Sequence, residues 1–346
     1  METTDWAAVQ RIVPELMGVL QNRLRILQRV NALAPIGRRA LAQAMGQSER
    51  TLRSELDALK QQGLLLTSTS GVTLSTEGLT LLRQLEPVAA ALAGRSDLAW
   101  RLSQALAVAN VIVVEGDSDV EPWVTERIGS SAGELLIDAI RDGDVIAVTG
   151  GTTVAALAKS APVRSGLRDI QVVPARGTVG ETVAYQANTI AAELAEKLGG
   201  RSVMLHIPDS LSQKALEQLL EDPYIQQRLP VIRSATVVVH GIGDALAMAR
   251  RRHASDAELA LLTERAAKAE AFGHYFNAYG EVVYAMQTIG LRLTDVDRSR
   301  LVVAVAGGAS KAQAIAAVAQ AYRIDVLVTD EGAARRLLQM KSEFDM

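Results

Sequence analysis

The stretch LVVAVAGGASKAQAIAAVAQA (residues 301–321) contains in order an apolar strand, two glycines, a serine, a lysine and a helix. A second stretch, VIAVTGGTTVAALAKS (145–160), has the same layout without the lysine. Apolar strands that alternate with helices are typical of a mostly parallel sheet covered on both faces. In such sheets ligands bind at the carboxyl ends of the strands, where helix N–H groups favour anions. The two stretches therefore predict an α/β fold with two candidate phosphate-binding loops.

Five further apolar, β-branched runs extend this pattern, and helical segments separate most of them. They lie at 111–114, 170–174, 203–207, 236–239 and 324–328. The length of 346 residues suggests two or three domains. We therefore expect a Rossmann-like, mostly parallel α/β effector domain over residues 111–346.

The first 86 residues show a different order of elements. Hydrophobic spacing predicts three helices and then a hairpin, at 15–33, 38–45, 49–62 and 64–75. A glycine turn at Gly46 separates the second helix from the third. This order is typical of a winged helix-turn-helix, so we expect a DNA-binding domain over residues 1–86.

Residues 87–110 are rich in alanine and favour a helix, with Pro87 and Gly94 as breaks. We interpret this segment as a linker helix between the two domains. Winged helices commonly act as dimers on repeated half-sites. We therefore expect a homo-oligomer, either a dimer or a tetramer, held partly by the linker helix.

The charge of the chain is distributed unevenly. The formal net charge is −3, whereas residues 23–60 hold eight lysines and arginines against three acidic residues, a local balance of +5. A basic head on an acidic remainder suggests that only the head contacts operator DNA. The alternative is a solvated helical domain with scattered arginines. We expect the DNA contacts to come from the second and third helices, at Arg38, Arg39, Ser48, Arg50, Thr51 and Arg53.

Each glycine pair is accompanied by donors that a phosphate-binding loop needs. The two loops together offer Gly150, Gly151, Thr152, Thr153, Gly308, Ser310 and Lys311. Neither loop matches the P-loop or the dinucleotide-binding pattern. For either loop alone, a tight strand-to-helix turn is an equally good interpretation. We expect one ligand with two phosphates to bridge the loops, with one phosphate on each.

Further charged residues lie near the ends of predicted strands. Arg176 directly follows a strand in VPARG (173–177), and three arginines follow one another at 250–252. Spacing alone does not decide which of those three faces a ligand. Glu270 is a candidate acceptor for sugar hydroxyls, or a candidate base if the protein is an enzyme.

The composition excludes several kinds of chemistry. The chain has no cysteine, which excludes disulfides, thiolate zinc sites and thiol nucleophiles. None of the four histidines has metal-ligand spacing, and no serine-hydrolase elbow occurs. We therefore expect no metal, no cofactor and no catalytic residue. Because no apolar run could span a bilayer and METTDWAAVQ (1–10) lacks signal-peptide features, we expect a cytoplasmic protein with no membrane partner.

A set of short stretches together resembles the SorC family of bacterial transcription regulators over essentially the whole chain. They are PIGRR (35–39), SERTLR (48–53), GDSD (116–119), PWV (122–124), AVTGGTT (147–153), VPARG (173–177), QANTI (186–190), HGIG (240–243), EAFGHYFNA (270–278), VAGGASKAQAI (305–315) and VLVTDEGAA (326–334). Within that family, the stretches are most similar to regulators that repress a glycolytic operon.

The resemblance implies an effector domain similar to the sugar-phosphate isomerases and deaminases. It also implies fructose-1,6-bisphosphate as the inducer. By position, the family's ligand contacts fall on Thr152, Thr153, Arg176, Gln186, Arg251, Glu270 and Lys311. The resemblance thus selects Arg251 among the three arginines, which spacing leaves open.

The main alternative is a sugar-phosphate isomerase or deaminase with an added helical domain. The related deaminases follow their G-I-G turn with a segment ending in Asp-Gly-His, whereas Ala245, Leu246 and Ala247 stand there in this chain. The missing acid and histidine favour a sequence-specific repressor that binds a sugar phosphate without converting it. A regulator of the same fold that responds to a monophosphate or a free polyol is a third interpretation.

Overall fold

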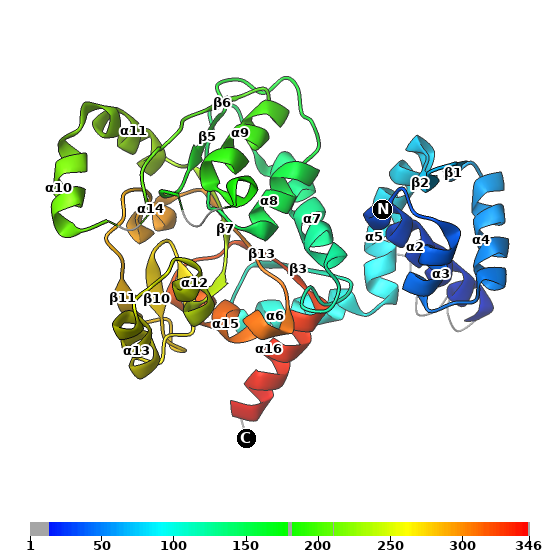
Figure 1. The fold of residues 1–346 in the computed structure, drawn as a ribbon. Helices are drawn as coiled ribbons and strands as arrows, with labels where there is room; N and C mark the ends of the chain where they lie inside the picture. Colours follow the sequence, from blue (N-terminus) through cyan, green and yellow to red (C-terminus); the bar gives the residue numbers. More distant parts are fainter. Residues whose placement is uncertain (1–13, 179–181, 210, 345–346) are drawn as a thin grey trace. The chain divides into compact units, whose positions relative to one another are not determined.

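The computed structural model describes residues 14–178, 182–209 and 211–344. Contacts between residues divide the chain into two compact units, Met1–Asp97 and Leu98–Met346, and each is described here by itself (Figure 1). The division falls inside the predicted linker 87–110. The N-terminal unit therefore includes the first part of that segment.

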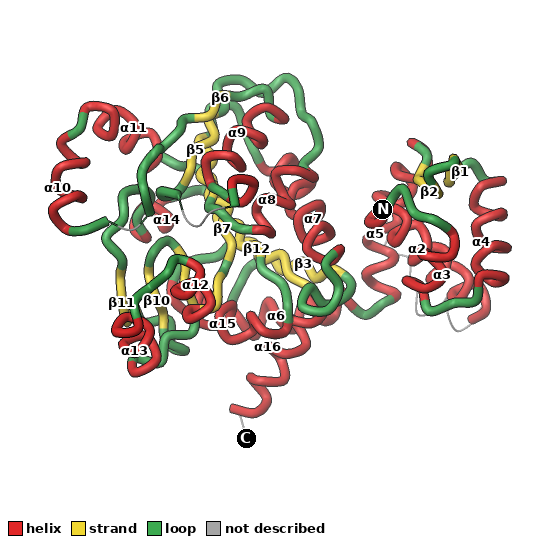
Figure 2. The backbone as a smooth tube through the Cα atoms, in the orientation of Figure 1, coloured by secondary structure: helices red, strands yellow, loops and turns green. Residues whose placement is uncertain are grey.

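The N-terminal unit has the element order of a winged helix-turn-helix. It contains α2 (Pro14–Leu33), α3 (Arg38–Met45), α4 (Glu49–Gln61), a hairpin of β1 (Leu65–Ser68) and β2 (Gly71–Leu74), and α5 (Thr76–Leu92) (Figure 2). Gly46 ends α3 in the left-handed region at φ +61°, which glycine adopts without steric cost. Ser48 caps α4 by accepting a hydrogen bond from the Thr51 N–H. The helices and the hairpin enclose a core that includes Ile26, Leu41 and Leu52.

The predicted linker differs from the structure at its first break. Pro87 lies inside α5, which continues to Leu92 through an alanine-rich run of high helix propensity. Gly94, at φ +69°, does separate α5 from the next helix, α6 (Arg95–Leu106). The segment 87–110 is therefore the end of one helix, a break and a second helix, rather than one linker helix.

The C-terminal unit is built on a seven-stranded parallel sheet, as predicted. Its order is β3-β13-β12-β7-β4-β5-β6, and the neighbouring strands run parallel. The strands are β3 (Asn110–Val114), β4 (Val145–Val148), β5 (Gln171–Pro174), β6 (Arg201–Ser202), β7 (Val237–Gly241), β12 (Leu301–Val305) and β13 (Val326–Asp330). The run 203–207, predicted as a strand, lies beyond the short β6.

Helices cover both faces of this sheet, which explains the near-continuous apolar strands. One face packs against α7 (Trp123–Ala139), α8 (Thr152–Ser160) and α9 (Ala187–Lys197). The other face packs against α6, α11 (Pro223–Arg233), α15 (Ala312–Ala321) and α16 (Glu331–Phe344). Two cores on opposite faces hold the strand ends rigidly, and the candidate loops follow β4 and β12 at those ends.

A small antiparallel sheet with the order β11-β10-β9-β8 was not predicted. It contains β8 (Gly243–Asp244), β9 (Ala269–Ala271), β10 (His274–Phe276) and β11 (Val282–Ala285). The remaining elements are the helices α10 (Gln213–Glu221), α12 (Ala245–Arg251), α13 (Asp256–Glu264) and α14 (Leu293–Arg298), with the 3-10 turns η1 (Val183–Tyr185) and η2 (Ala309–Lys311). In the described parts of the chain, no helix has the length and apolar character needed to cross a membrane.

Candidate functional site

A single pocket brings most of the predicted ligand-binding residues together. It lies at the carboxyl ends of β4, β5, β7 and β12 and has a volume of about 320 Å³. Every predicted ligand-binding residue except Gly308 lines it, namely Gly150, Gly151, Thr152, Thr153, Arg176, Gln186, Arg251, Glu270, Ser310 and Lys311. Because β7 alone separates β4 from β12 in the sheet, the two glycine loops flank the same cavity.

The first glycine loop leaves the N-terminus of α8 open to the pocket. Gly151 adopts φ +124°, and a Cβ placed on it would meet nothing within 4 Å. Among the described residues, no side chain caps α8 at its N-terminus. The free N–H groups of the first helical turn and the helix dipole favour an anion at this point. The first loop therefore has the local structure that an anion site requires.

The second glycine loop differs, because aspartates already occupy its backbone donors. The Gly308 N–H donates to Asp330 Oδ2 at 2.8 Å. The Ser310 N–H and hydroxyl donate to the two carboxylate oxygens of Asp119 at 2.7 and 2.9 Å. This differs from the expectation that the backbone of this loop receives a phosphate, since the donors bind the buried Asp330 and the exposed Asp119 instead.

The glycines of the second loop make room for these carboxylates. A Cβ on Gly307 would lie 2.4 Å from Asp330 Oδ2, and one on Gly308 would lie 2.3 Å from Asp119 Oδ1. Real Cβ atoms do not come this close to oxygen. The glycine pair is therefore required by the carboxylates next to it, whereas Gly151 in the first loop faces open space.

Lys311 is the residue of the second loop whose side chain remains available to a ligand. Its side chain lines the cavity. Burial lowers the pKa of Lys311, the carboxylates of Asp119 and Asp330 oppose that effect, and Arg251 adds to it. Lys311 is thus the cation that the second loop brings to the pocket.

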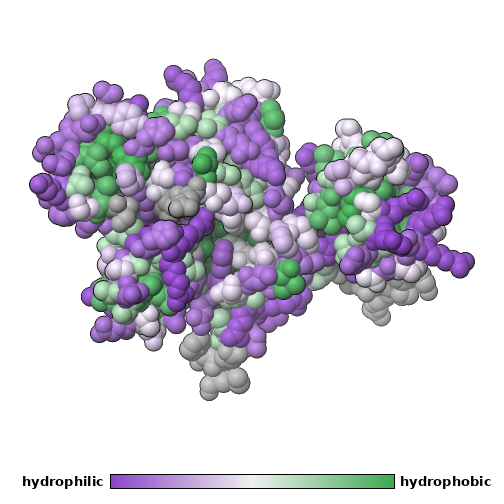
Figure 3. Space-filling model, in the orientation of Figure 1, coloured by the Kyte–Doolittle hydropathy of each residue, from purple (hydrophilic) through white to green (hydrophobic). Residues whose placement is uncertain are grey.

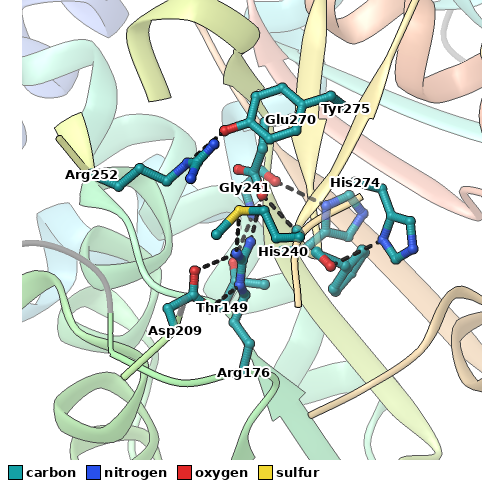
Figure 4. A network of polar contacts seen from close by, with 12 residues as sticks. Thr149, Arg176, Asp209, His240, Gly241, Arg252, Glu270, His274 and Tyr275 are labelled. Carbon is teal, nitrogen blue, oxygen red and sulfur yellow. Dashed lines mark hydrogen bonds and ion pairs between the residues drawn. The ribbon is translucent and has the colours of Figure 1, made fainter. Parts of the chain in front are cut away.

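Arg176 is already engaged in a buried ion-pair network (Figure 4). Its guanidinium pairs with both carboxylate oxygens of Asp209 and with Glu270 Oε1. Glu270 Oε1 also accepts the Gly273 N–H at 2.9 Å. Burial alone would lower the pKa of Arg176, but Glu270 and Asp209 outweigh it and raise the pKa above its ordinary value. Glu270 therefore acts first as a partner of Arg176, which the sequence did not indicate.

The three consecutive arginines separate into different environments. Arg251 lines the pocket, in agreement with the residue that the family resemblance selects. Arg252 instead pairs with Glu258 and donates from Nε to the Tyr275 hydroxyl at 2.8 Å (Figure 4). Burial, together with Glu270, raises the pKa of Tyr275 to about 12, so this hydroxyl stays neutral. Arg252 is thus a structural residue, and Arg251 is the ligand-binding candidate.

Beneath the pocket, His240 is fully buried on β7. Its Nδ1 lies 3.0 Å from the Gly241 carbonyl oxygen, and its ring packs against Phe272 and Tyr322. Burial lowers the pKa of His240 to about 4, although the hydrogen bond to Gly241 opposes the shift. The imidazole is therefore neutral at physiological pH and forms part of the pocket's support.

The sequence analysis did not single out four aspartates that bind the second loop or Arg176, namely Asp117, Asp119, Asp209 and Asp330. The signal for three of them was present, because GDSD (116–119) follows β3 and the acid of VTDEG (328–332) ends β13. Acids at the carboxyl ends of strands next to a glycine loop compete with any anion for its donors. Asp209 had no comparable signal, since it lies in an irregular segment far from Arg176 in sequence.

The N-terminal unit presents the predicted DNA contacts on its surface. Leu52, Leu56 and Leu59 bury one side of α4, and hydrophilic residues gather over α4 on the face seen in Figure 3. The predicted contact residues are all exposed, namely Arg38, Arg39, Ser48, Arg50, Thr51 and Arg53. Their role in DNA binding stays a prediction.

Two of these arginines have acidic neighbours that DNA would have to replace. Arg39 pairs with Glu49 at 2.9 Å, and Arg53 lies 3.9 Å from Asp57. Both pairs are exposed, and exposed ion pairs are weak enough for DNA phosphates to exchange with them.

A winged helix-turn-helix and an α/β unit with a cationic pocket define a class of DNA-binding regulators that respond to a small ligand. Two family models match the chain accordingly. Residues 19–89 match the "CggR N-terminal DNA binding domain", and residues 91–339 match the "Putative sugar-binding domain". The chain belongs to the SorC family of sugar-binding transcriptional regulators.

Curated relatives agree with the family over nearly the whole chain. The Central glycolytic genes regulator of Priestia megaterium is 44% identical over 95% of this chain and 97% of its own length. The protein of the same name from Bacillus subtilis is 43% identical over 96% of this chain and 98% of its own length. These relatives are regulators, so the comparisons favour the regulator over the isomerase or deaminase.

Solved structures show the same architecture. A SorC family regulator from Enterococcus faecalis is 40% identical, with a TM-score of 0.66 over 70% of this chain and 99% of that chain. The full-length sorbitol operon regulator from Klebsiella pneumoniae is 21% identical, with a TM-score of 0.66 over 88% of this chain and 94% of that chain. The second likeness concerns the fold alone.

Proposed function

We propose that this protein represses glycolytic genes and that a sugar phosphate, fructose-1,6-bisphosphate, releases it from operator DNA. The observation that carries the proposal is the open N-terminus of α8 in the same pocket as Lys311 and Arg251. The pocket volume of about 320 Å³ lies within the range of small-molecule sites, roughly 300–1,000 Å³. The names of two curated relatives that match nearly the whole chain support glycolytic genes as the target.

One phosphate of the ligand binds the first loop, where the α8 N–H groups and the hydroxyls of Thr152 and Thr153 meet it. Lys311 reaches the ligand from the second loop as a point charge. Arg251 is exposed at the pocket and receives the second phosphate. Compared with the bridging interpretation of the sequence, the second loop contributes its lysine and not its backbone.

We further propose that the protein acts in the cytoplasm as a homo-oligomer. Winged helices that read repeated half-sites commonly act as dimers. Ligand binding must also alter the affinity of the DNA-binding units for operator DNA. A change in the contacts between subunits is one way to transmit this effect. Sedimentation as a monomer at every concentration, with and without DNA, would contradict this part of the proposal.

The decisive experiment is a titration of the full-length protein with labelled operator duplex, with and without fructose-1,6-bisphosphate. Selection from random duplexes supplies the operator. We expect tight, salt-dependent binding that weakens when the sugar bisphosphate is added, and a smaller effect from a monophosphate. Specific binding that no sugar phosphate alters would contradict the proposed effector.

The same titration tests the recognition helix. The double variant Arg50→Ala, Arg53→Ala should lose sequence preference, since one bidentate base contact is worth about 1–3 kcal/mol. Arg38→Ala should instead weaken binding to all sequences and reduce the salt dependence. Normal operator binding by the Arg50, Arg53 double variant would exclude α4 as the recognition helix.

A further inference from the structure

Three aspartates hold the turn at residues 308–310 from the side away from the pocket. Asp330 accepts the Gly308 N–H, Asp119 accepts both donors of Ser310, and Asp117 Oδ1 lies 3.4 Å from the Ala309 nitrogen, which donates to it. In the sheet order, β13 and β3 follow β12 on the side opposite β7. The acids therefore reach the turn from the β13 and β3 side, and the pocket lies on the β7 side.

The three acids differ in how deeply they are buried. Asp330 is fully buried and accepts three backbone N–H groups, from Ser118, Gly308 and Ala333. Asp119, in contrast, is exposed, and its carboxylate binds Ser310. Asp330 is thus part of the fold, whereas Asp119 can be changed without leaving a buried donor unpaired.

Lys311, the residue after this turn, lines the pocket together with Arg251. Burial and the nearby Arg251 both favour its neutral form, and Asp119 and Asp330 favour its charged form. Arg176 and Glu270, which also line the pocket, are already paired with each other. The acids behind the turn therefore supply the negative charge that Lys311 faces when the pocket holds no anion.

We propose that Asp119 is a positioning residue that fixes the turn before Lys311 and directs its ammonium into the pocket, and thereby raises the affinity for phosphate-bearing ligands. The inference rests on the proposed function for the identity of the ligand. It assigns Asp119 a role at the effector site although its side chain does not line the cavity. Its two hydrogen bonds fix the turn, and its charge stabilises the ammonium that follows.

The charge role has a consequence that a purely structural role lacks. Asp119→Asn keeps the shape of the side chain and one hydrogen-bond acceptor but removes the negative charge. The pKa of Lys311 should fall, because the charge of Asp119 favours the protonated form and its loss leaves burial and Arg251 less opposed. Ligand affinity should then decline at a lower pH than in the wild type.

The experiment measures fructose-1,6-bisphosphate affinity by calorimetry between about pH 7 and pH 10, around the ordinary range of a perturbed lysine. The alkaline decline in affinity should move to lower pH in Asp119→Asn. Asp138→Asn, on the exposed side of α7, changes the net charge equally and should leave the profile unchanged. An unshifted profile in a folded Asp119→Asn variant would overturn the proposal.

A second variant separates charge from position. Arginine does not deprotonate in this range, so Lys311→Arg should remove the alkaline decline. Adding Asp119→Asn to Lys311→Arg should then shift nothing along the pH axis. A shift that persists in the double variant would assign the effect to another group and contradict the proposal.

Failure of the proposed ligand can be distinguished from failure of this inference. The pKa of Lys311 is measured in the ligand-free protein by NMR of ¹³C-labelled lysine side chains, with Lys311→Arg to assign the resonance. A pKa that falls in Asp119→Asn supports the inference even if the sugar bisphosphate does not bind. An unchanged pKa overturns it, whatever the calorimetry shows.

Discussion

The two glycine loops share a layout in sequence but differ in what satisfies their donors. After β4, the Gly151 N–H donates to the Tyr185 carbonyl oxygen at 2.9 Å, and the first turn of α8 has no side-chain cap among the described residues. After β12, the donors of Gly308 and Ser310 bind carboxylates that approach closely because glycines leave room. A glycine pair after a strand therefore does not by itself indicate an anion site. The acids on the neighbouring strands decide whether the donors are free.

The difference follows from the position of each loop in the sheet. β12 is flanked by β13, which ends in Asp330, and β3 beyond it leads into the segment with Asp117 and Asp119. β4 lies between β7, which ends in Gly241, and β5, after which Arg176 follows. The donors of the second loop thus bind acids, whereas the first loop shares its pocket with Arg176, which is itself paired with Asp209 and Glu270. Of the two loops, the first therefore favours an anionic ligand.

The largest expected effect concerns the internal carboxylate of the second loop. Asp330→Ala should lower the free energy of unfolding of the C-terminal unit by about 3–5 kcal/mol, because three N–H groups lose their acceptor. Urea unfolding followed by tryptophan fluorescence measures it, since Trp100 and Trp123 lie in this unit. Asp138→Ala is the exposed control. A loss below about 1 kcal/mol would mean that the second loop does not depend on its aspartate.

Acid should lower the stability of the sheet that carries both loops, because the buried His240 lies on β7 between them. Its folded pKa of about 4 is below the ordinary value of 6.5, so the unfolded chain binds a proton that the folded chain does not. Stability should therefore fall as the pH falls from about 6.5 toward 4, by about 3 kcal/mol in total. His240→Gln should remove this decline. An equally steep decline in the variant would assign the acid sensitivity to other groups.

Removing the lysine should weaken ligand binding while preserving the fold. Lys311→Ala should reduce fructose-1,6-bisphosphate affinity by about tenfold to a hundredfold, since a charge-assisted hydrogen bond is worth roughly 1.5–3 kcal/mol. Operator affinity without ligand should be unchanged, so in cells the repressor should resist induction. Calorimetry and operator titration check the two halves separately. Unchanged affinity in a folded variant would make Lys311 an ordinary surface lysine.

Much of the fold could be predicted because local patterns agree with the final packing. The parallel strands are apolar throughout since both faces are covered, and α4 buries its leucines on one side. The small antiparallel sheet was missed because its strands are only two to four residues long. Pro87 was misjudged because a proline break was given more weight than the alanine run that follows.

The residues that line the pocket could be predicted from the sequence, but the contacts among their side chains could not. Donor-rich loops and cations after strands identified the pocket, since parallel strands gather their carboxyl ends at one edge. Which carboxylates meet Arg176 depends on its tertiary contacts with Asp209 and Glu270, which lie 33 and 94 residues away in sequence. The occupied donors of the second loop depend on strand order, which a sequence pattern does not contain.

The central claim is that the backbone and hydroxyls of the first loop bind one phosphate of the ligand, whereas the second loop contributes only the side chain of Lys311. The direct test removes one hydroxyl from each loop, Thr152→Val and Ser310→Ala, at two exposed positions that line the same pocket. Calorimetry with fructose-1,6-bisphosphate should show a loss of about tenfold or more for Thr152→Val, because a hydrogen bond to a charged group disappears. Ser310→Ala should stay within about threefold of the wild type, since that hydroxyl donates to Asp119. A larger loss in Ser310→Ala than in Thr152→Val would contradict the account.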